Sequence, residues 1–317
     1  MSENSMVEFP QIDWNQAVAK QATLLVQMAL EEDFADQRDW TTWSTIPQDS
    51  TGVARFVCRQ PGIVAGLPIV DLIMSEMQRS GIMDGDLIWS SKATDGDQVE
   101  KGTVLGELSG STRSLLQMER TTLNFLGRLS GIATLTHQFV ESVKGTGAGI
   151  YDTRKTTPGW RLLEKYAVRC GGGRNHRLGL YAAVMLKDNH LAADDGDAGV
   201  RLVNKVKHAQ SQLAAARQAG ELSRDLIFEV EVDSLQQLEA LLDLDIDIIL
   251  LDNMGPETLR QAVVMRDQRQ PKIQLEASGG VQLSTVRAIA ESGVERISSG
   301  SLTHSAVNWD IGLDWVD

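Results

Sequence analysis

A run of basic side chains between residues 149 and 190 is the stretch whose residue types could carry out chemistry. The whole chain has 30 Lys and Arg residues against 43 Asp and Glu residues, a formal charge of −13. From residue 152 to residue 190, however, eight Lys and Arg residues stand against three Asp and Glu residues. Average composition does not explain this local excess, so the segment predicts a site for a small polyanion.

The positions of these cations distinguish binding residues from surface residues. Arg154 and Lys155 follow an apolar pair and precede the turn sequence TTPG, and Lys187 follows the short apolar run 183–186, which is typical of strands that end in loops. His176 and Arg177 follow three glycines, where backbone can approach a ligand closely. Cations at strand ends and on a glycine loop converge more often for binding than for solubility.

Three other cations in this stretch favour a different interpretation. Arg161, Lys165 and Arg169 recur every four residues, the spacing of one face of a helix. We interpret these three as a solvated basic face.

The elements that must position the cations alternate between strand and helix patterns from residue 149 onward. Ser234 and Gln237 predict a capping box at the start of one helix, and Pro256 suits the first turn of the next. Strands are expected near Ile150, Val184, Ile227, Ile248, Ile273 and Ile297. This order predicts a parallel sheet in a TIM-like α/β barrel, incomplete with about six strands; a doubly wound sheet is the alternative.

Each expected strand ends in a polar side chain. These side chains are Arg154, Lys187, Glu231, Asp252, Glu276 and Ser299. The carboxyl ends of barrel strands carry the chemistry, and repetition in six units favours a site over incidental polar caps. Glycine-containing turns follow two late strands, at Ser278, Gly279 and Gly280 and at Ser299 and Gly300, where backbone amides could bind a phosphate.

The first part of the chain predicts a separate α+β domain. Helical patterns cover residues 14–30, 69–78 and most of 111–144, and short apolar pieces between DG and KG turns predict a small antiparallel sheet. Gly127 and Gly131 lie inside the long helix and predict close packing or a break. We expect this domain to span residues 1–121, with the tail 302–317 packed on it, and the barrel to span 122–301.

Composition excludes several function classes. The acidic balance argues against nucleic acid and anionic membranes as partners. Two cysteines, no signal pattern and no long apolar run lead us to expect a soluble cytoplasmic protein. The stretch DGDQVEKGTVLGEL is similar to the hairpin of biotinyl and lipoyl carrier domains. Neither Lys92 nor Lys101 lies at a tight hairpin tip, where a carrier needs its modified lysine. We therefore interpret the similarity as structural and not as a sign of carrier function.

Several motifs in order resemble those of the quinolinate phosphoribosyltransferase family. They are DTRKTTPG from Asp152, EKYAVRCGGGRNHRLGL from Glu164, KDNH from Lys187, ERTTLNFLGRLSGIAT from Glu119, EVEV from Glu229, LLDNM from Leu250, EASGG from Glu276 and SSGSLTHS from Ser298. The resemblance covers most of the chain. One departure is Ala182, where many members carry Asp, and we expect it to alter local support rather than the reaction.

The resemblance implies a reaction and a role for each matching residue. The family transfers phosphoribosyl from phosphoribosyl pyrophosphate (PRPP) to quinolinate with decarboxylation, giving nicotinate mononucleotide, pyrophosphate and CO2 in NAD biosynthesis. The family's quinolinate-binding positions match Arg120, Arg154, His176, Arg177 and Lys187. Lys155 and His304 match pyrophosphate contacts, and the glycine turns match the 5-phosphate site.

The family's acids match Glu231 and Asp252, which would stabilise the oxocarbenium-like transition state, bind the ribose or bind a Mg²⁺ carried in with PRPP. With Lys155 and Lys187 they are the expected catalytic residues, and no fixed metal cage is evident. A homodimer or larger assembly is expected, with Arg120 reaching the partner's site. The alternatives are a related protein of molybdenum transport, or a non-catalytic anion sensor, against which the presence of both acids argues.

Overall fold

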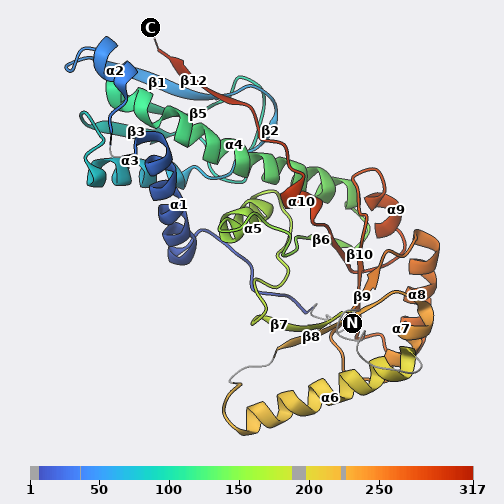
Figure 1. The fold of residues 1–317 in the computed structure, drawn as a ribbon. Coiled ribbons are helices and arrows are strands. Elements are labelled where there is room, and N and C mark those ends of the chain that lie inside the picture. Colours follow the sequence, from blue (N-terminus) through green and yellow to red (C-terminus); the bar gives the residue numbers. More distant parts are fainter. Residues whose placement is uncertain (1–6, 36, 188–197, 223–225, 317) are drawn as a thin grey trace. The chain divides into compact units, whose positions relative to one another are not determined.

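The computed structural model describes residues 7–35, 37–187, 198–222 and 226–316 (Figure 1). The chain forms two compact units, and each is discontinuous in sequence. The parallel-sheet unit contains Met1–Pro10, Phe139–Arg154 and Arg174–Ser299. The antiparallel-sheet unit contains Gln11–Gln138, Lys155–Gly173 and Gly300–Asp317.

Six parallel strands form the core of the first unit, as the sequence predicts. They are β6 (Gly149–Tyr151), β7 (Ala183–Leu186), β8 (Ile227–Val232), β9 (Ile248–Asp252), β10 (Gln274–Ser278) and β11 (Arg296–Ser298). Their order in the sheet is β6-β11-β10-β9-β8-β7, which is the order of a barrel opened between β6 and β7. Within the described ranges β6 and β7 do not pair, so the prediction of an incomplete barrel is confirmed.

Four described helices of this unit follow β7, β8, β9 and β10 in the chain. They are α6 (Ala198–Gln218), α7 (Leu235–Leu241), α8 (Pro256–Arg269) and α9 (Val286–Ala290). Helix α8 begins at Pro256 as predicted, because proline lacks the N–H that a first turn leaves unpaired. The capping box predicted before α7 is wrong in part: the Gln237 side chain accepts from the Asp233 amide at 3.0 Å, while Ser234 makes no side-chain cap.

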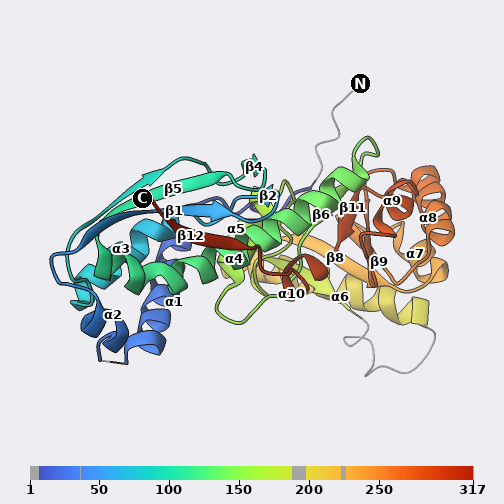
Figure 2. The same ribbon diagram turned by 90° about the horizontal axis from the view of Figure 1, so that it is seen from above.

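An antiparallel sheet of order β12-β1-β5-β3 forms the second unit, with helices α1 and α3 packed together on one side of it (Figure 2). Its strands are β1 (Thr51–Cys58), β3 (Leu87–Ser91), β5 (Val104–Ser111) and β12 (Ile311–Trp315), and a further pair is β2 (Gly62–Ile63) with β4 (Gln98–Val99). Its helices are α1 (Gln16–Phe34), α2 (Trp40–Thr45), α3 (Pro68–Ser80), α4 (Thr112–Val143, most of it in this unit), α5 (Arg161–Cys170) and α10 (Ser301–His304).

The C-terminal tail is part of this second sheet. Strand β12 pairs with β1 from Ala54 opposite Trp315 to Cys58 opposite Ile311.

Helix α4 is continuous through its two glycines, and a Cβ on Gly131 would lie 2.1 Å from the Val307 carbonyl oxygen. The predicted close packing is therefore confirmed, and the alternative of a break is wrong. The expected domain boundary at residue 121 stays a prediction.

Helix α5 corrects one interpretation of the basic segment. Lys165 is fully buried, and all residues from 163 to 168 are buried with it. Arg169 donates to the Gly173 carbonyl at 3.0 Å, and Arg161 donates to the Thr156 hydroxyl at 3.1 Å. A solvated basic face is therefore wrong for this helix, because neighbouring elements cover most of its circumference. No helix of the described ranges is long and apolar enough to cross a membrane.

Candidate active site

One face of the parallel sheet carries a row of polar side chains. Residues paired in register on parallel strands point to the same face, and alternation with a period of two adds every second residue. Glu231 pairs with Leu250, Leu250 with Glu276, and Glu276 with Arg296. Two residues further along these strands, toward their carboxyl ends, the same face carries Asp252, Ser278 and Ser298. Asp252 and Ser278 pair with each other, and Ser298 ends β11. The face therefore presents charged groups at the strand ends and also one layer deeper.

Two neighbouring guanidiniums, the buried Arg177 and the half-buried Arg154, are predicted anion contacts. Arg177 is 6% exposed, and its Nη1 donates to the Ala183 carbonyl at 3.3 Å. Burial lowers the pKa of Arg177 below its usual range; the nearby charge of Glu229 opposes this shift and that of Arg154 adds to it. The Nε of Arg154 is buried without a hydrogen-bond partner. Among the described residues no carboxylate is bonded to either guanidinium, so an incoming dianion would find both available.

A lysine and two acids lie at the adjoining strand ends. Lys187 Nζ, directly after β7, donates to the Glu231 carboxylate on β8. Asp252 ends β9 and accepts from the Asn253 side-chain amide at 2.7 Å. The structure thus brings a predicted substrate cation into contact with a predicted transition-state acid.

The predicted phosphate turn after β10 has the backbone that only glycine adopts readily. Gly279 and Gly280 have φ of +89° and +60°, and a Cβ on Gly279 would lie 2.3 Å from the Asn253 side-chain oxygen. Ser299, after β11, donates from its hydroxyl to the Val281 carbonyl at 3.2 Å. This bond joins the turn after β10 to the turn after β11, and Ser278 is the last residue of β10.

The remaining predicted site residues belong to the antiparallel-sheet unit. A Cβ on Gly300 would lie 2.7 Å from Lys155 Cδ and 3.2 Å from the His304 ring. The Thr303 hydroxyl also donates to the Lys155 carbonyl at 2.7 Å, so Lys155, Gly300 and His304 lie together. Arg120 is exposed on α4.

A buried charged cluster lies beneath the strand ends, and the motif analysis does not identify it as a unit. His176 Nε2 is 3.2 Å from a Glu229 carboxylate oxygen and 3.3 Å from one of Glu276. Arg296 Nε donates to Glu276 at 2.8 Å. His176 is 5% exposed, and the other three side chains have no exposure. We call His176, Glu229, Glu276 and Arg296 the buried charge cluster.

The proton content of this cluster follows from its hydrogen bonds. Burial by itself lowers the pKa of His176, but the charges of Glu229 and Glu276 outweigh burial and raise the pKa to about 9. A second proton on the ring would occupy Nδ1, which accepts from the Arg177 amide at 2.8 Å. Burial also raises the pKa of Glu229, so that carboxyl can hold the proton instead. One proton shared by His176 and Glu229 would make the cluster neutral wherever it lies.

A sequence signal for this cluster exists. Glu229 and Glu276 each lie two residues before a predicted site residue, Glu231 and Ser278, inside strands that are otherwise apolar. The interpretation of Glu276 as a strand end is wrong, because β10 continues to Ser278. A charged side chain inside a buried strand must find a partner, so these positions point to an internal network.

His176, Glu229 and Glu276 offer three ligand atoms that lie within 4.8 Å of one another, a spacing that suits a metal ion. Arg296 already bonds Glu276, and the shared proton competes for the remaining ligand atoms. Two half-buried carboxylates at adjacent strand ends, Glu231 and Asp252, fit a Mg²⁺ that keeps several ligands from a substrate phosphate.

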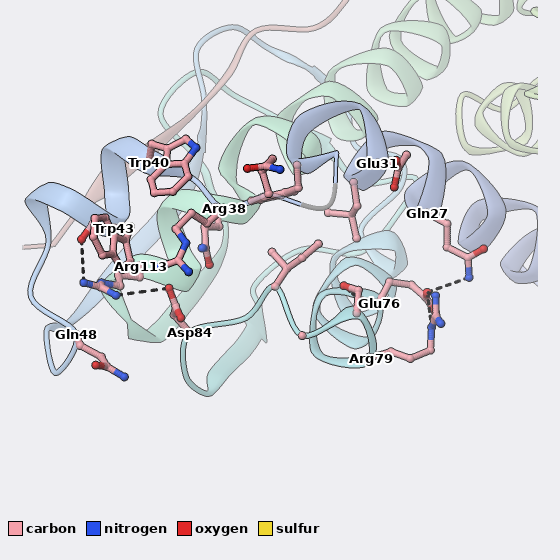
Figure 3. A pocket seen from close by; sticks show the side chains of 17 residues that line it. Gln27, Glu31, Arg38, Trp40, Trp43, Gln48, Glu76, Arg79, Asp84 and Arg113 are labelled. Carbon is pink, nitrogen blue, oxygen red and sulfur yellow. Dashed lines mark hydrogen bonds and ion pairs between the residues drawn. The ribbon is translucent and has the colours of Figure 1, made fainter.

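A separate cavity of about 870 Å³ lies within the antiparallel-sheet unit (Figure 3). Arg38 lies over the rings of Trp40 and Trp43 at 5.4 and 5.1 Å, and Arg79 bonds Glu76 at 2.6 Å. None of the predicted site residues lines this cavity, so it does not belong to the candidate site.

Comparisons with known proteins agree with the motif analysis. Residues 39–130 match the quinolinate phosphoribosyl transferase N-terminal domain, and residues 132–314 match the C-terminal domain of the same family. The nicotinate-nucleotide pyrophosphorylase [carboxylating] of Mycobacterium leprae is 42% identical over 91% of this chain and 95% of its own length. The nicotinate-nucleotide pyrophosphorylase from Francisella tularensis superposes with a TM-score of 0.84 at 31% identity, covering 98% of this chain and 100% of that one.

Proposed function

Because the chain belongs to the quinolinate phosphoribosyl transferase family, we propose that it transfers phosphoribosyl from PRPP to the ring nitrogen of quinolinate, releasing pyrophosphate and CO2. The product is nicotinate mononucleotide, a precursor of NAD. One observation of the structure carries this proposal: Arg154 and Arg177 are neighbouring cations with no bonded carboxylate among the described residues. The molybdenum-transport alternative is not favoured, since the relatives reported above carry pyrophosphorylase names.

The two carboxylates of quinolinate complement these cations. Guanidinium groups bind carboxylates through paired, charge-assisted hydrogen bonds. Lys187 would turn from Glu231 toward the substrate or hold both at once, since it already contacts Glu231. His176 belongs to the buried charge cluster and accepts from the Arg177 amide. We therefore assign it two roles: it holds the Arg177 backbone, and it faces the ligand.

The acids at the strand ends serve the transfer of the phosphoribosyl group. Departure of pyrophosphate leaves positive charge on the ribosyl carbon, which Glu231 and Asp252 would stabilise electrostatically. Bound with PRPP, Mg²⁺ would supply charge neutralisation of the pyrophosphate, and these two carboxylates are the residues that would hold it.

The anionic ends of PRPP have two sets of candidate contacts. The turns that contain Gly279 and Gly280 and Ser299 and Gly300 would take the 5-phosphate through backbone amides, with Ser278 beside them. Lys155 and His304, which lie together beside Gly300, would contact the pyrophosphate. Decarboxylation then needs little from the protein, because the ribosylated pyridinium ring accepts the electrons that CO2 leaves behind.

The assembly is part of the proposal. Arg120 is exposed on α4, and we propose a homodimer or a larger assembly in which this arginine completes the partner's site.

The direct test is pyrophosphate release on mixing the protein with PRPP, Mg²⁺ and quinolinate, with nicotinate in place of quinolinate as the comparison. Removing one carboxylate leaves a buried cation unpaired, which costs about 3 kcal/mol or more, so kcat/KM should fall by at least about 100-fold for nicotinate. Equal specificity constants for the two acids would contradict the assignment. Binding of quinolinate without any pyrophosphate release would instead favour the non-catalytic anion sensor.

A further inference from the structure

The first described residues of the chain lie in the parallel-sheet unit, beneath its site. Phe9 is 2% exposed and packs in one cluster with Ala183 and Ile248, the first residues of β7 and β9. The Val7 carbonyl accepts from Arg296 Nη1, at the start of β11, at 3.1 Å. The segment Val7–Phe9 therefore closes the amino-terminal end of this sheet.

Phe9 reaches from this end to the imidazole of the buried charge cluster. The ring centroids of Phe9 and His176 are 4.5 Å apart, with an interplanar angle of 34°. Arg296 Cζ lies 5.3 Å from the same Phe9 ring. The segment thus contacts both ends of the cluster, the imidazole and the guanidinium that neutralises Glu276.

Polar bonds hold the segment in place on its other side. Glu8 accepts from the Tyr151 hydroxyl at 2.7 Å and from Arg174 Nη1 at 2.5 Å. Tyr151 lies in β6, and Arg174 begins the stretch that contains His176 and Arg177. Contacts from Glu8 therefore fix the same stretch that carries the anion-binding arginine.

We infer that Val7–Phe9 is a positioning element for quinolinate. Phe9 packs against one face of the His176 ring, and the edges of that ring bond the glutamates and the Arg177 amide. By fixing the ring, the segment holds Arg177 in place. This inference rests on the proposed function. The edges of the His176 ring are held by Nε2 to the carboxylates and by Nδ1 to Arg177. Removing the aromatic face lets the ring tilt, which moves the Arg177 backbone directly.

The competing explanation is a hydrophobic plug with no influence on the site. Both explanations predict that removing Phe9 lowers stability, because Phe9 is part of the core. They differ in the substrate that is affected. A positioning element acts on quinolinate and leaves the PRPP contacts alone, whereas a plug affects neither Michaelis constant.

The experiment compares Phe9→Leu with Phe139→Leu. Phe139 is also 2% exposed and also belongs to the parallel-sheet unit, so it is matched for burial. We expect Phe9→Leu to raise the KM for quinolinate by about 3- to 10-fold, the range that one lost aromatic contact supports, with the KM for PRPP changed less than about 2-fold. Phe139→Leu should leave both constants unchanged.

A quinolinate KM that is as unchanged in Phe9→Leu as in Phe139→Leu would overturn the inference and leave Val7–Phe9 a plug. Glu8→Gln decides the matter if Phe9→Leu does not fold, since Glu8 is partly exposed and the change is isosteric. It should raise the quinolinate KM by about 2-fold, and no change would overturn the inference. A wild-type protein that releases no pyrophosphate from PRPP and quinolinate would count against the proposed function alone.

Discussion

Replacing Arg177 with Met should make the empty protein more stable while it removes quinolinate binding. Arg177 is 6% exposed, and no carboxylate among the described residues is bonded to its guanidinium. A buried charge without a bonded partner costs several kcal/mol, although the nearby Glu229 offsets part of this cost. We therefore expect the free energy of unfolding to rise by about 1 to 3 kcal/mol in Arg177→Met. Loss of the cation should weaken quinolinate binding by about 3 kcal/mol, or roughly 150-fold in Kd.

Arg266→Met is the matched control, because Arg266 is equally buried but paired. It is 4% exposed and bonds Glu295 at 2.7 Å and Asp267 at 2.7 Å. Removing these charge-assisted bonds should lower the free energy of unfolding by roughly 1.5 to 3 kcal/mol. The two arginine variants should thus shift stability in opposite directions.

The assay must report on the correct part of the molecule. All seven tryptophans belong to the antiparallel-sheet unit, so their fluorescence does not follow the parallel sheet directly. Urea unfolding followed by far-ultraviolet circular dichroism, with isothermal titration of quinolinate, measures both quantities. If Arg177→Met loses stability as Arg266→Met does, Arg177 is already compensated in the empty site and the reasoning is refuted.

Three further predictions concern the acids, the assembly and pH. Glu231→Gln and Asp252→Asn should each lower kcat by about 10²- to 10³-fold at saturating substrates and Mg²⁺ while quinolinate binding changes little; near-normal turnover would remove them from the mechanism. Mixing inactive Arg120→Ala and Lys187→Ala chains should restore activity in about a quarter of the sites, because each heterodimer has one intact site; no recovery despite subunit exchange would contradict the shared site. The folded cluster holds its proton up to about pH 9, above the ordinary histidine value of 6.5, so its contribution to stability is full below pH 6.5 and is lost as pH rises through 9. Unfolding of His176→Gln should lack this dependence, and an equal dependence would exclude the cluster.

The strands and helices were open to prediction because their signals are local. Strands β6, β7 and β9 are short, mostly apolar runs that end at or just before a polar residue, and Pro256 marks the start of α8 within a single turn. Motif resemblance then assigns Arg154, Arg177 and Lys187 to one substrate, and the sheet register brings Lys187 next to Glu231.

The buried charge cluster could not be predicted in the same way, because it depends on which strands are neighbours. Glu276 and Arg296 meet only when β10 pairs with β11 in the observed register. His176 meets them from a loop, and Phe9 comes from the other end of the chain. Lys165 shows the complementary error, since helical spacing identifies a shared face but does not show whether neighbouring elements cover that face.

The discontinuity of both units has a consequence for how the protein forms during synthesis. Val7–Phe9 is made long before its partner Arg296, which lies 289 residues after Val7. Strand β1, at residues 51–58, likewise waits for its partner β12 at residues 311–315. Domains usually fold as units as the chain emerges. Here neither unit can be completed until these distant segments have been made, so the apolar Phe9 and one edge of β1 stay uncovered in the interval.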